Sequence, residues 1–494
     1  SFSGQLLFTR PSLFSLLGQS ISARKTTVVF SSSRSLAIRA TMKIDSADFH
    51  SLFTPDFQIL RGLFEKKGYE LRIAGGAVRD LLMEKKPADI DLATSATPKM
   101  MIDLFNAEQI RMLHTNGELH GTVTCRIGEN NYEITTLRID EVCDGRRAKV
   151  SFTTDWELDA NRRDLTVNSL FLDLNGEVVD YTGGIEDCKN KRVAFVGDAA
   201  RRIQEDYLRI LRYFRFFGRI SPEGAKHEEE TIKAIVNHKG GIAQVSPERI
   251  WVEMKRVVIG RMAPAVVKVM LHECGLAILL GLPEGSLSHM DRFETVYKRG
   301  MEMEKKHNGV KLESMTMVAA LCTTKNEIEE FHKKTKLSNL ERDLGEFIVD
   351  RRKEAEITVE QGGASQLTYW RRLFALEYGP TMKEKVRSDG DRVRDRVVQL
   401  AITVGAPDEV ISDLLSSSHP PPFPIDGRIL MEAGVPAGPQ MHSVKNYLFH
   451  LWVQSDFSLS KEQLLTHTQD PDIPPPPVKV NAGKRKREKS SGDK

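Results

Sequence analysis

The stretch RIAGGAVRDLLMEKKPADIDLAT, residues 72–94, carries the clearest structural signal in the chain. It predicts a strand that ends at Gly75-Gly76, a short helix, and a second strand that carries Asp89 and Asp91. Because side chains alternate along a strand, both carboxylates should lie on one face, about 7 Å apart. Two like charges at this spacing repel each other unless a cation lies between them.

This strand–helix–strand unit combines features that suit phosphate chemistry. A double glycine lets the backbone approach a phosphate closely, with helix N–H groups directed at it. Mg²⁺ prefers carboxylate oxygens and keeps open positions for substrate phosphates. A glycine turn or an Asp-x-Asp pair alone is more common as an ordinary turn or a solvated loop. Both motifs together with Arg79 in one unit favour metal-dependent phosphoryl or nucleotidyl transfer.

The composition of the chain is that of an ordinary soluble globular protein. The 494 residues are 40% hydrophobic and 28% charged, and the formal net charge is +3. Any nucleic-acid binding must therefore come from local basic surfaces. No apolar run reaches the roughly 18 residues that a membrane span needs. The five cysteines are scattered without a Cys-x-x-Cys pair, which argues against disulfides and zinc and is typical of reduced thiols inside the cell.

Residues 1–41 differ from the rest of the chain. They contain arginine, lysine and many serines, and no acidic residue occurs before Asp45. This composition, with apolar residues that could line one side of a basic helix, is typical of a mitochondrial transit peptide. An unstructured N-terminus is the alternative. A start at Met42 would give a form without this segment, which could act in the cytoplasm or the nucleus.

The pattern of the chain changes from mixed to helical near residue 197. Residues 42–196 alternate predicted strands with helices, and an Asn-Gly pair predicts a β-hairpin, so this part should be an α+β domain with a mixed sheet. Beyond it the apolar residues recur with a helical period. Proline-rich stretches at residues 419–424 and 474–477 set off a short helical module and a basic tail.

A second candidate cluster is NRRDLTVN, residues 161–168. Its two adjacent guanidinium groups, followed by Asp164 and Asn168, could clamp a triphosphate and hydrogen-bond a ribose hydroxyl. The same residues also suit the start of a helix with surface salt bridges, which is the commoner use of such a motif.

The third cluster, EDYLRILRYFR, lies in a predicted continuous helix over residues 199–220. On a helical wheel, Asp206 lies about 50° from the centre of the apolar arc, and Arg209 lies one i+3 step away. A ligand at the edge of the arc would be partly desolvated. Arg212 and Arg215 should turn farther round, toward solvent or RNA. The alternative is an i,i+3 ion pair at the surface.

Together these segments resemble the class II CCA-adding tRNA nucleotidyltransferases of the polymerase-β-like nucleotidyltransferase superfamily. GGAVRDLL followed by DIDLAT resembles the catalytic motif of that family, RRDLTVNS its ribose-reading motif, and EDYLRILRYFRF its base-reading helix. DGRR at residues 144–147 and SPERI at residues 246–250 resemble two further elements. The order and spacing of all five agree. The resemblance extends from about residue 42 to about residue 468 and is strongest in the first half.

The resemblance implies an α+β fold with several domains. A polymerase-β-like nucleotidyltransferase head with a mixed sheet would precede all-helical neck, body and tail domains. The expected divisions are a transit peptide at residues 1–41, the catalytic head at 42–196, a neck for base recognition at 197–275, a body at 276–418, a tRNA-binding tail at 419–470 and a disordered end at 471–494.

The resemblance also implies the reaction, which is addition of C, C and A to the tRNA 3′ end from CTP and ATP without a nucleic-acid template. Asp89 and Asp91 would hold two Mg²⁺ ions, which divide activation of the 3′-hydroxyl and neutralisation of the triphosphate between them. The other residues that the resemblance places at the nucleotide are Gly76, Arg79, Arg163, Asp164, Asn168, Asp206, Arg209, Arg212 and Arg215.

The pair Asp206 and Arg209 suits a choice between bases. Cytosine and adenine both present an amine donor beside a ring-nitrogen acceptor, so a carboxylate can accept from the amine while a guanidinium donates to the ring. Uracil and guanine reverse this order, and a buried carboxylate would then face a carbonyl at a cost of several kcal/mol. One protein site would thus accept CTP and ATP and reject UTP and GTP.

The expected partner is tRNA, bound at its 3′ end and at its acceptor and T arms, with the chain as a monomer or a homodimer. Basic clusters at residues 305–306, 333–334, 351–353 and 371–372 could contact its phosphates. Each cluster alone also suits a solvated face. The tail KRKR at residues 484–487 resembles a nuclear import signal or an RNA-binding patch.

Two other functions fit the same motifs. The first is a poly(A) polymerase of the same superfamily. The second is an RNA-binding protein without catalytic activity, against which the presence of Asp89 and Asp91 argues. Glu133 alternates with apolar positions in a predicted strand over residues 132–138. It would be either a third acid near the metals or a structural residue.

Overall fold

The computed structural model describes residues 40–113, 121–141, 149–363, 365–380, 387–416 and 419–476. The chain divides into two compact units, residues 1–190 and 191–494. The predicted loop at residues 144–147 and the basic tail at residues 484–487 lie outside the described residues, as does nearly all of the predicted transit peptide.

The first unit is built on an eight-stranded mixed sheet in the order β1-β10-β9-β2-β3-β6-β5-β4, and β7 and β8 form a second, two-stranded sheet. β3 and β6 run parallel, and the other paired strands run antiparallel. The strands are β1 (Ala40–Lys43), β2 (Leu71–Ala74), β3 (Asp91–Thr94), β4 (Arg111–Leu113), β5 (Thr122–Ile127), β6 (Asn130–Thr136), β7 (Arg138–Glu141), β8 (Lys149–Phe152), β9 (Phe171–Leu172) and β10 (Glu177–Asp180). The predicted α+β fold with a mixed sheet is confirmed.

Local sequence signals set the helices of this unit. Thr54 and Thr97 cap α2 and α4 with their side chains, and each is followed by a proline in the first turn. Gly68 ends α2 in the left-handed conformation at φ 68°. The helices are α1 (Ala47–His50), α2 (Pro55–Lys67), α3 (Gly76–Leu82), α4 (Pro98–Ala107), α5 (Trp156–Asn161) and α6 (Gly184–Lys189).

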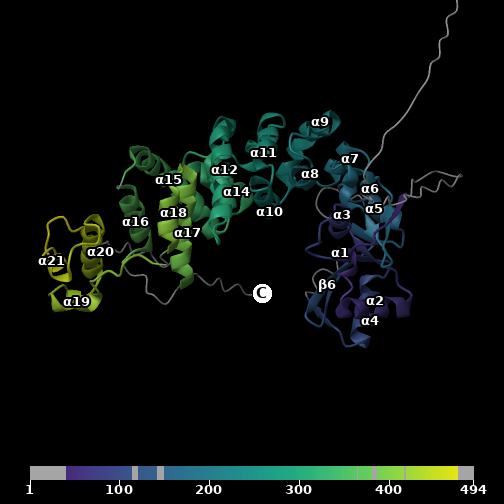
Figure 1. Ribbon diagram of the computed structural model, residues 1–494, viewed down its shortest axis with the longest axis horizontal. Helices are drawn as coiled ribbons and strands as arrows, with labels where there is room; N and C mark the ends of the chain where they lie inside the picture. Colours follow the sequence, from purple (N-terminus) through teal and green to yellow (C-terminus); the bar gives the residue numbers. More distant parts are fainter. Residues whose placement is uncertain are drawn as a thin grey trace, which may run out of the picture. The chain divides into compact units, whose positions relative to one another are not determined.

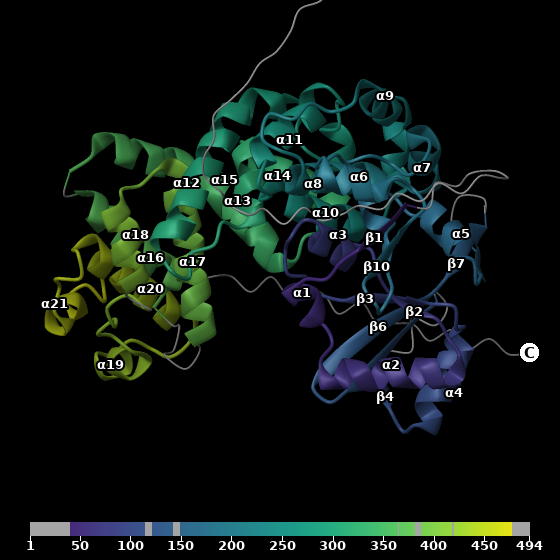
Figure 2. The ribbon, with the colours of Figure 1, turned by 45° about the vertical axis from the view of Figure 1, so that its right-hand side comes forward.

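One core of the first unit lies between the sheet and two helices. α2 and α4 lie beside each other and both pack on β5 (Figure 2). Phe64 and Phe105 are fully buried there, with ring centroids 6.2 Å apart. Leu92 on β3 and Ile134 on β6 are also buried. Because strand residues alternate, the neighbouring positions on β3 and β6 point to the opposite face of the sheet.

The second unit consists of helices, and its described residues contain no strand (Figure 1). No described helix is long and apolar enough to cross a membrane. The α-helices are α7 (Ala199–Glu205), α8 (Leu208–Ile220), α9 (Glu229–His238), α10 (Pro247–Val258), α11 (Ala263–His272), α12 (Met290–Lys306), α13 (Ser314–Leu321), α14 (Lys325–Thr335), α15 (Asn339–Gln361), α16 (Ser365–Tyr378), α17 (Arg387–Val404), α18 (Asp408–Ser416), α19 (Gly427–Glu432), α20 (Pro439–Gln454) and α21 (Lys461–Leu465).

The prediction of one continuous helix over residues 199–220 is wrong at its centre. Asp206 ends α7 with an extended backbone at φ −155° and ψ 104°, and α8 begins at Leu208. The ring of Tyr207 lies directly against the backbone of Gly241, where an added Cβ atom would meet ring carbons at 2.0 Å. The chain turns at this contact, so a helical wheel does not place Asp206.

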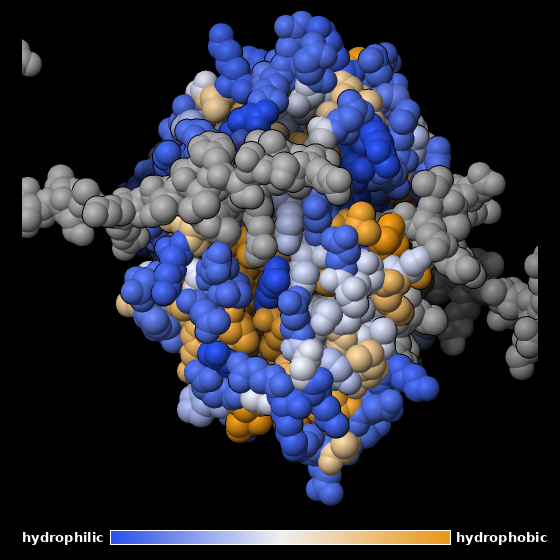
Figure 3. Space-filling view, turned by 90° about the vertical axis from the view of Figure 1, so that its right-hand side faces the viewer, coloured by the Kyte–Doolittle hydropathy of each residue, from blue (hydrophilic) through white to orange (hydrophobic). Residues whose placement is uncertain are grey.

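The exposed surface carries scattered apolar side chains. Ile59 and Leu158 in the first unit and Val252 in the second are about half exposed. On the face shown in Figure 3, hydrophobic residues form separate patches among hydrophilic ones. Single exposed apolar side chains are normal on folded proteins, and these carry no functional inference.

Burial sets the protonation of one histidine in the second unit. Nδ1 of His227 lies 2.9 Å from the hydroxyl of Tyr213, and its ring stacks on Phe217 with centroids 3.7 Å apart. Burial lowers the pKa of His227 from 6.5 to about 4. The imidazole is therefore neutral at pH 7 and packs as an aromatic side chain.

We expect His227 to make the stability of the protein depend on pH. Its folded-state pKa lies below that of an unfolded histidine, so its stabilising contribution is present above about pH 6.5 and is lost toward pH 4. The free energy of unfolding should fall by on the order of 1 to 2 kcal/mol between pH 7 and pH 5. His227→Phe should flatten this dependence in urea unfolding, whereas exposed His442→Gln should not. An unchanged dependence in the His227 variant would contradict the assignment.

Candidate active site

The two predicted catalytic carboxylates lie at the start of β3. Asp89 is in the bend before the strand and Asp91 is its first residue, so the strand begins later than predicted. Both residues are exposed. Asp91 is paired with Ala74 at the end of β2 and with Glu133 on β6. The carboxylates therefore lie next to the turn that follows β2.

Negative charge is concentrated at this edge of the sheet. Partial desolvation raises the pKa of Asp91, the guanidinium of Arg163 opposes this rise, and the carboxylate of Asp89 adds to it. Desolvation and the charge of Asp91 also raise the pKa of Glu133. A cation bound between these carboxylates would relieve their repulsion, as expected for a metal site.

The donor set fits a hard divalent cation that is held partly by its substrate. Asp89 and Asp91 offer the carboxylate oxygens that Mg²⁺ and similar ions prefer. Among the described residues, no group of three or more His, Cys, Asp or Glu side chains forms a complete ligand cluster. Two carboxylates leave coordination positions for phosphate oxygens and water.

The glycine pair forms the turn between β2 and α3. Gly75 has φ 64° and ψ −117°, a conformation that favours glycine. An added Cβ atom at Gly75 would lie 3.4 Å from both Nη1 of Arg163 and the carbonyl oxygen of Asn168. The segment at residues 161–168 thus packs closely against the turn, and α3 begins there with Gly76.

Arg79 is buried and holds α3 against the segment at residues 161–168. Its Nε and Nη2 donate to Oδ1 of Asp80 at 3.0 and 2.9 Å. Its Nη1 donates to Oδ1 of Asn168 at 2.6 Å. Arg79 is only 3% exposed, and these contacts suit a residue that positions its neighbours.

Asp159 was not predicted, yet it anchors both adjacent arginines. It is 1% exposed. Oδ1 accepts from Nε of Arg162 at 2.8 Å, and Oδ2 accepts from Nε and Nη2 of Arg163 at 3.1 and 3.0 Å. Burial alone would raise the pKa of Asp159, but the guanidiniums of Arg163 and Arg162 hold it below its usual range. The i,i+3 and i,i+4 spacing to the arginines was the available signal.

Asn168 joins the predicted residues of the first unit into one network. Its Oδ1 accepts from Arg79, and its carbonyl oxygen accepts from Nη1 of Arg163 at 3.2 Å. Its Nδ2 lies 3.5 Å from Oδ1 of Asp164, which also accepts from the amide of Leu165 at 2.8 Å. The structure therefore brings together four predicted residues, although Arg79 and Asn168 are 89 positions apart in the sequence.

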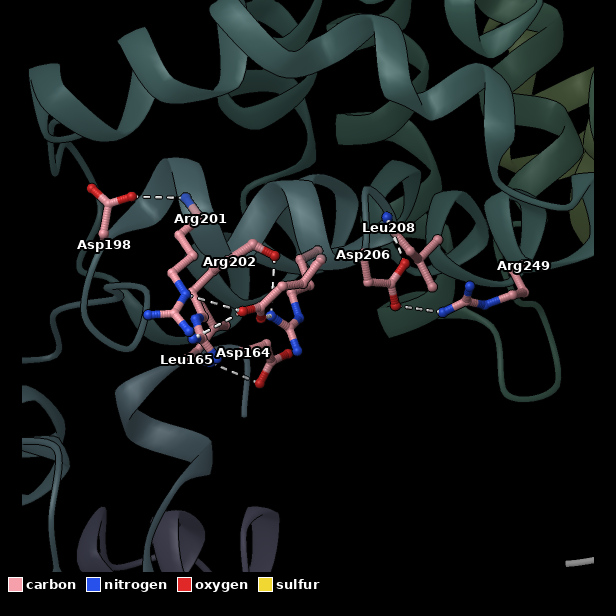
Figure 4. Close-up of polar contacts among 10 residues, drawn as sticks. Asp164, Leu165, Asp198, Arg201, Arg202, Asp206, Leu208 and Arg249 are labelled. Carbon is pink, nitrogen blue, oxygen red and sulfur yellow. Dashed lines mark hydrogen bonds and ion pairs between the residues drawn. The ribbon is translucent and has the colours of Figure 1, made fainter. Parts of the chain in front are cut away.

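Asp206 stands at the break between α7 and α8 in the second unit (Figure 4). Its Oδ1 accepts from the amide of Leu208 at 3.1 Å, and its Oδ2 forms an ion pair with Nη2 of Arg249 at 2.7 Å. The side chain of Asp206 remains 32% exposed. Arg249 belongs to the SPERI segment at the start of α10 and was not itself predicted as a site residue. The ion pair shows that this segment orients the carboxylate expected to read the base.

Arg209 lies in the first turn of α8 and is mostly buried. Its Nη1 donates to the carbonyl oxygen of Arg202 at 3.0 Å and to Oε2 of Glu205 at 2.7 Å. Its amide donates to the carbonyl oxygen of Asp206 at 2.9 Å. Asp206 and Arg209 are thus neighbours at the helix break, and each side chain is held in place by an oppositely charged residue.

Arg212 and Arg215 both face a buried carboxylate, Glu253 of α10. Arg215 Nε lies 2.7 Å from Glu253 Oε2, and Arg212 Nη1 lies 3.7 Å from Oε1. The side chain of Arg215 is 12% exposed and packs over Phe216, so the prediction that it turns toward solvent is wrong. Glu253 comes from a helix that a wheel drawn for α8 alone does not include. Arg212 is 32% exposed.

Two family models match the chain. Residues 71–194 match the poly A polymerase head domain, and residues 226–284 match a probable RNA and SrmB-binding site of polymerase A. The first range contains the carboxylate pair, the glycine turn and the network around Asn168.

Relatives that match along most of the chain are more specific. The mitochondrial CCA tRNA nucleotidyltransferase 1 of Homo sapiens is 39% identical over 428 residues, which are 86% of this chain and 93% of the relative. The Danio rerio protein of the same name is 40% identical over 427 residues, with the same coverage. The crystal structure of the Bacillus stearothermophilus CCA-adding enzyme in complex with CTP matches with a TM-score of 0.64 at 25% identity, covering 84% of this chain and 97% of that one. The chain therefore belongs to the CCA tRNA nucleotidyltransferases and is a CCA-adding enzyme.

Proposed function

We propose that this enzyme takes CTP and ATP and adds C, C and A to the 3′ end of tRNA without a nucleic-acid template. One observation carries the proposal: a single chain holds a carboxylate pair beside a glycine turn and an Asp206–Arg209 pair at a helix break. The CTP bound to the Bacillus stearothermophilus relative and the tRNA in the name of the Homo sapiens relative support these substrates. The whole-length relatives also favour CCA addition over poly(A) synthesis.

In the proposed reaction, the 3′-hydroxyl of tRNA attacks the α-phosphorus of the nucleotide, and the bond to the bridging oxygen breaks to release pyrophosphate. Asp89 and Asp91 would hold Mg²⁺, which when bound supplies Lewis-acid stabilisation of phosphate charge and favours loss of the hydroxyl proton. Partial desolvation and the charge of Asp89 both raise the pKa of Asp91. A bound cation would stabilise the ionised carboxylate and oppose this rise. Glu133, the neighbour of Asp91 on β6, is our candidate for a third acid.

Arg163 is the cation of the first unit that we assign to the triphosphate. It is close enough to Asp91 to oppose the rise in that pKa. Its guanidinium lies over the ring of Phe171, 4.8 Å from the centroid, and Asp159 fixes its orientation. We place Asp164 and Asn168 beside the sugar. Gly76 and Arg79 would shape the turn that receives the phosphates.

We assign base recognition to Asp206 and Arg209. The ion pair with Arg249 orients the Asp206 carboxylate, which is still exposed enough to accept from the amine of cytosine or adenine. A uracil carbonyl at the same place would repel that carboxylate and leave it without a donor. Arg212 and Arg215, held by Glu253, would support this helix from the side of α10.

We further propose that the enzyme works in mitochondria. Residues 1–41 have the composition of a transit peptide, and the Homo sapiens and Danio rerio relatives are named as mitochondrial proteins. A form that starts at Met42 would lack this segment, and its location in the cytoplasm and the nucleus remains a prediction. Base recognition by residues 197–275 and tRNA binding by residues 419–470 are the corresponding domain proposals.

The nucleotide requirement tests the proposed function directly. Purified protein with Mg²⁺ and a tRNA that lacks its 3′ CCA should add two residues with CTP alone, and one more when ATP is also present. UTP and GTP should be incorporated poorly. Sequencing gels of the extended tRNA would show these products. A long tract made with ATP alone, without use of CTP, would instead establish a poly(A) polymerase.

Asp89→Ala should reduce nucleotide addition by about a thousandfold, because it removes half of the carboxylate pair that binds the cation. Binding of tRNA should change little, since this residue contacts the metal and not the RNA. Asp103→Ala removes an exposed aspartate on α4 and serves as the matched control. Retained activity in the Asp89 variant would refute the metal assignment.

Asp206→Ala should weaken the choice between CTP and UTP about tenfold or more, because the repulsion that excludes uracil is lost. The ratio of kcat/KM for the two nucleotides measures this choice. Asp343→Ala, an exposed aspartate on α15, is the control. An unaltered ratio in the Asp206 variant would count against base reading by this carboxylate.

A further inference from the structure

A hollow of about 560 Å³ lies in the second unit, away from the residues described above. α12, the turn between α13 and α14, and α15 form its walls, and these helices are labelled in Figure 2. Its charged lining comprises four cations and two anions, namely Arg292, Lys325, Arg352, Lys353, Asp350 and Glu356. The hollow is therefore basic overall.

Two arginines line this hollow, and within the described part of the chain their guanidiniums donate to backbone carbonyls alone. Arg292 donates from Nε to the carbonyl of Ala320 at 2.6 Å and from Nη2 to that of Cys322 at 3.0 Å. Arg352 donates from Nη1 to Ala319 at 2.9 Å and from Nη2 to Cys322 at 2.8 Å. Each guanidinium has five N–H donors, so about three remain on each after these bonds.

Neither guanidinium has a carboxylate at ion-pair distance within the described part of the chain. Arg352 is 5% exposed, and a buried charge without a counter-charge is costly. Burial lowers the pKa of Arg352 to about 10, and the neighbouring Arg292 contributes to this fall. Burial and these two arginines also lower the pKa of His289. Opposing the effect of burial, the charges of Glu356 and Glu327 raise the pKa values of both guanidiniums. The positive charge of the hollow is therefore compensated only in part, and by carboxylates beyond ion-pair distance.

The other basic clusters of this unit are largely neutralised. Arg371 pairs with Asp413, and Arg372 pairs with Asp456. Lys333 pairs with Glu330. Further ion pairs of this kind are Lys306 with Glu302 and Asp408, and Arg351 with Glu354 and Glu377. At the hollow, by contrast, Lys325 pairs with Asp350, while the two arginines and the exposed Lys353 are left for an added anion.

We propose that this hollow binds a phosphate group of the RNA backbone, clamped by Arg292 and Arg352 and flanked by Lys353. Guanidinium forks match the oxygens of a phosphodiester. An entering phosphate would bind both arginines directly, whereas Glu356 and Glu327 act on them only from beyond ion-pair distance. The volume exceeds that of one phosphate group and leaves room for the adjoining sugar. The inference rests on the proposed tRNA substrate, and it adds a specific subsite in the helical unit.

The test measures binding of tRNA without its 3′ CCA to wild-type protein, Lys353→Glu and the matched control Lys311→Glu over a series of KCl concentrations. Lys311 is an exposed lysine between α12 and α13, outside the hollow and outside the basic clusters named above. Lys353→Glu should weaken the Kd about tenfold and lower the slope of log Kd against log salt by about one. Lys311→Glu should change both quantities much less. Equal effects of the two variants, or none, would overturn the proposal.

Because Arg292 also bonds to the end of α13, Arg292→Gln is compared only after circular dichroism shows that it is folded. The exposed Lys353 variant keeps the test independent of that outcome.

Inorganic phosphate, at constant ionic strength, should raise the Tm of the wild type more than that of Lys353→Glu and should compete with tRNA. If phosphate raises the Tm of the wild type but Lys353→Glu leaves the Kd for tRNA unchanged, the hollow is a site for free phosphate. That result would refute the RNA assignment. Failure of the wild type to bind or extend tRNA would instead refute the proposed function.

Discussion

The first unit of this enzyme depends on hydrogen bonds that converge on Asn168. Its amide and carbonyl groups hold Arg79 and Arg163, and the turn at Gly75 packs against Arg163 and the backbone of Asn168. Asp159 supplies the buried negative charge without which two adjacent guanidiniums would repel each other. This arrangement matters because two carboxylates lie close together at the start of β3, and their negative charges are partly balanced by Arg163, which the network holds in a fixed orientation. Rigid donors that are already in place cost little reorganisation when a triphosphate binds.

The second unit solves a related problem at the break between α7 and α8. In a continuous helix, the position of Asp206 around the helix axis would alone decide whether its side chain is buried or exposed. The turn at Tyr207, pressed on Gly241, instead presents the carboxylate at a helix end, where the amide of Leu208 and the guanidinium of Arg249 hold it. We propose that Asp206 reads the base, and such a group must be oriented before the base arrives, since a mobile carboxylate would accept several hydrogen-bond patterns. Polar contacts at the break provide that orientation.

Charge pairing also separates cations that serve the fold from cations that are free for a ligand. Most arginines and lysines of the helical unit that looked like RNA contacts in the sequence are matched by a carboxylate. The pair Arg292 and Arg352 differs, because each bonds to the carbonyls at the end of α13 and keeps its full charge. Carbonyl dipoles satisfy N–H donors, but they neutralise a guanidinium less than a carboxylate does. The hollow therefore stands out because no carboxylate of the described residues pairs directly with its two arginines, and not by its number of basic residues.

The sequence alone determined the mixed α+β head, the helical remainder, and a family likeness that the relatives confirm, because the motifs that carry them are short and local. Gly75-Gly76 and the two carboxylates lie within one strand–helix–strand unit, and the periodicity of the later segments is plainly helical. Only the tertiary structure decided the rest. Arg249 reaches Asp206 from 43 residues away, Glu253 draws Arg215 out of solvent, and Gly241 receives the ring that divides the predicted helix. Local propensity does not contain such contacts, since each depends on where a distant helix packs.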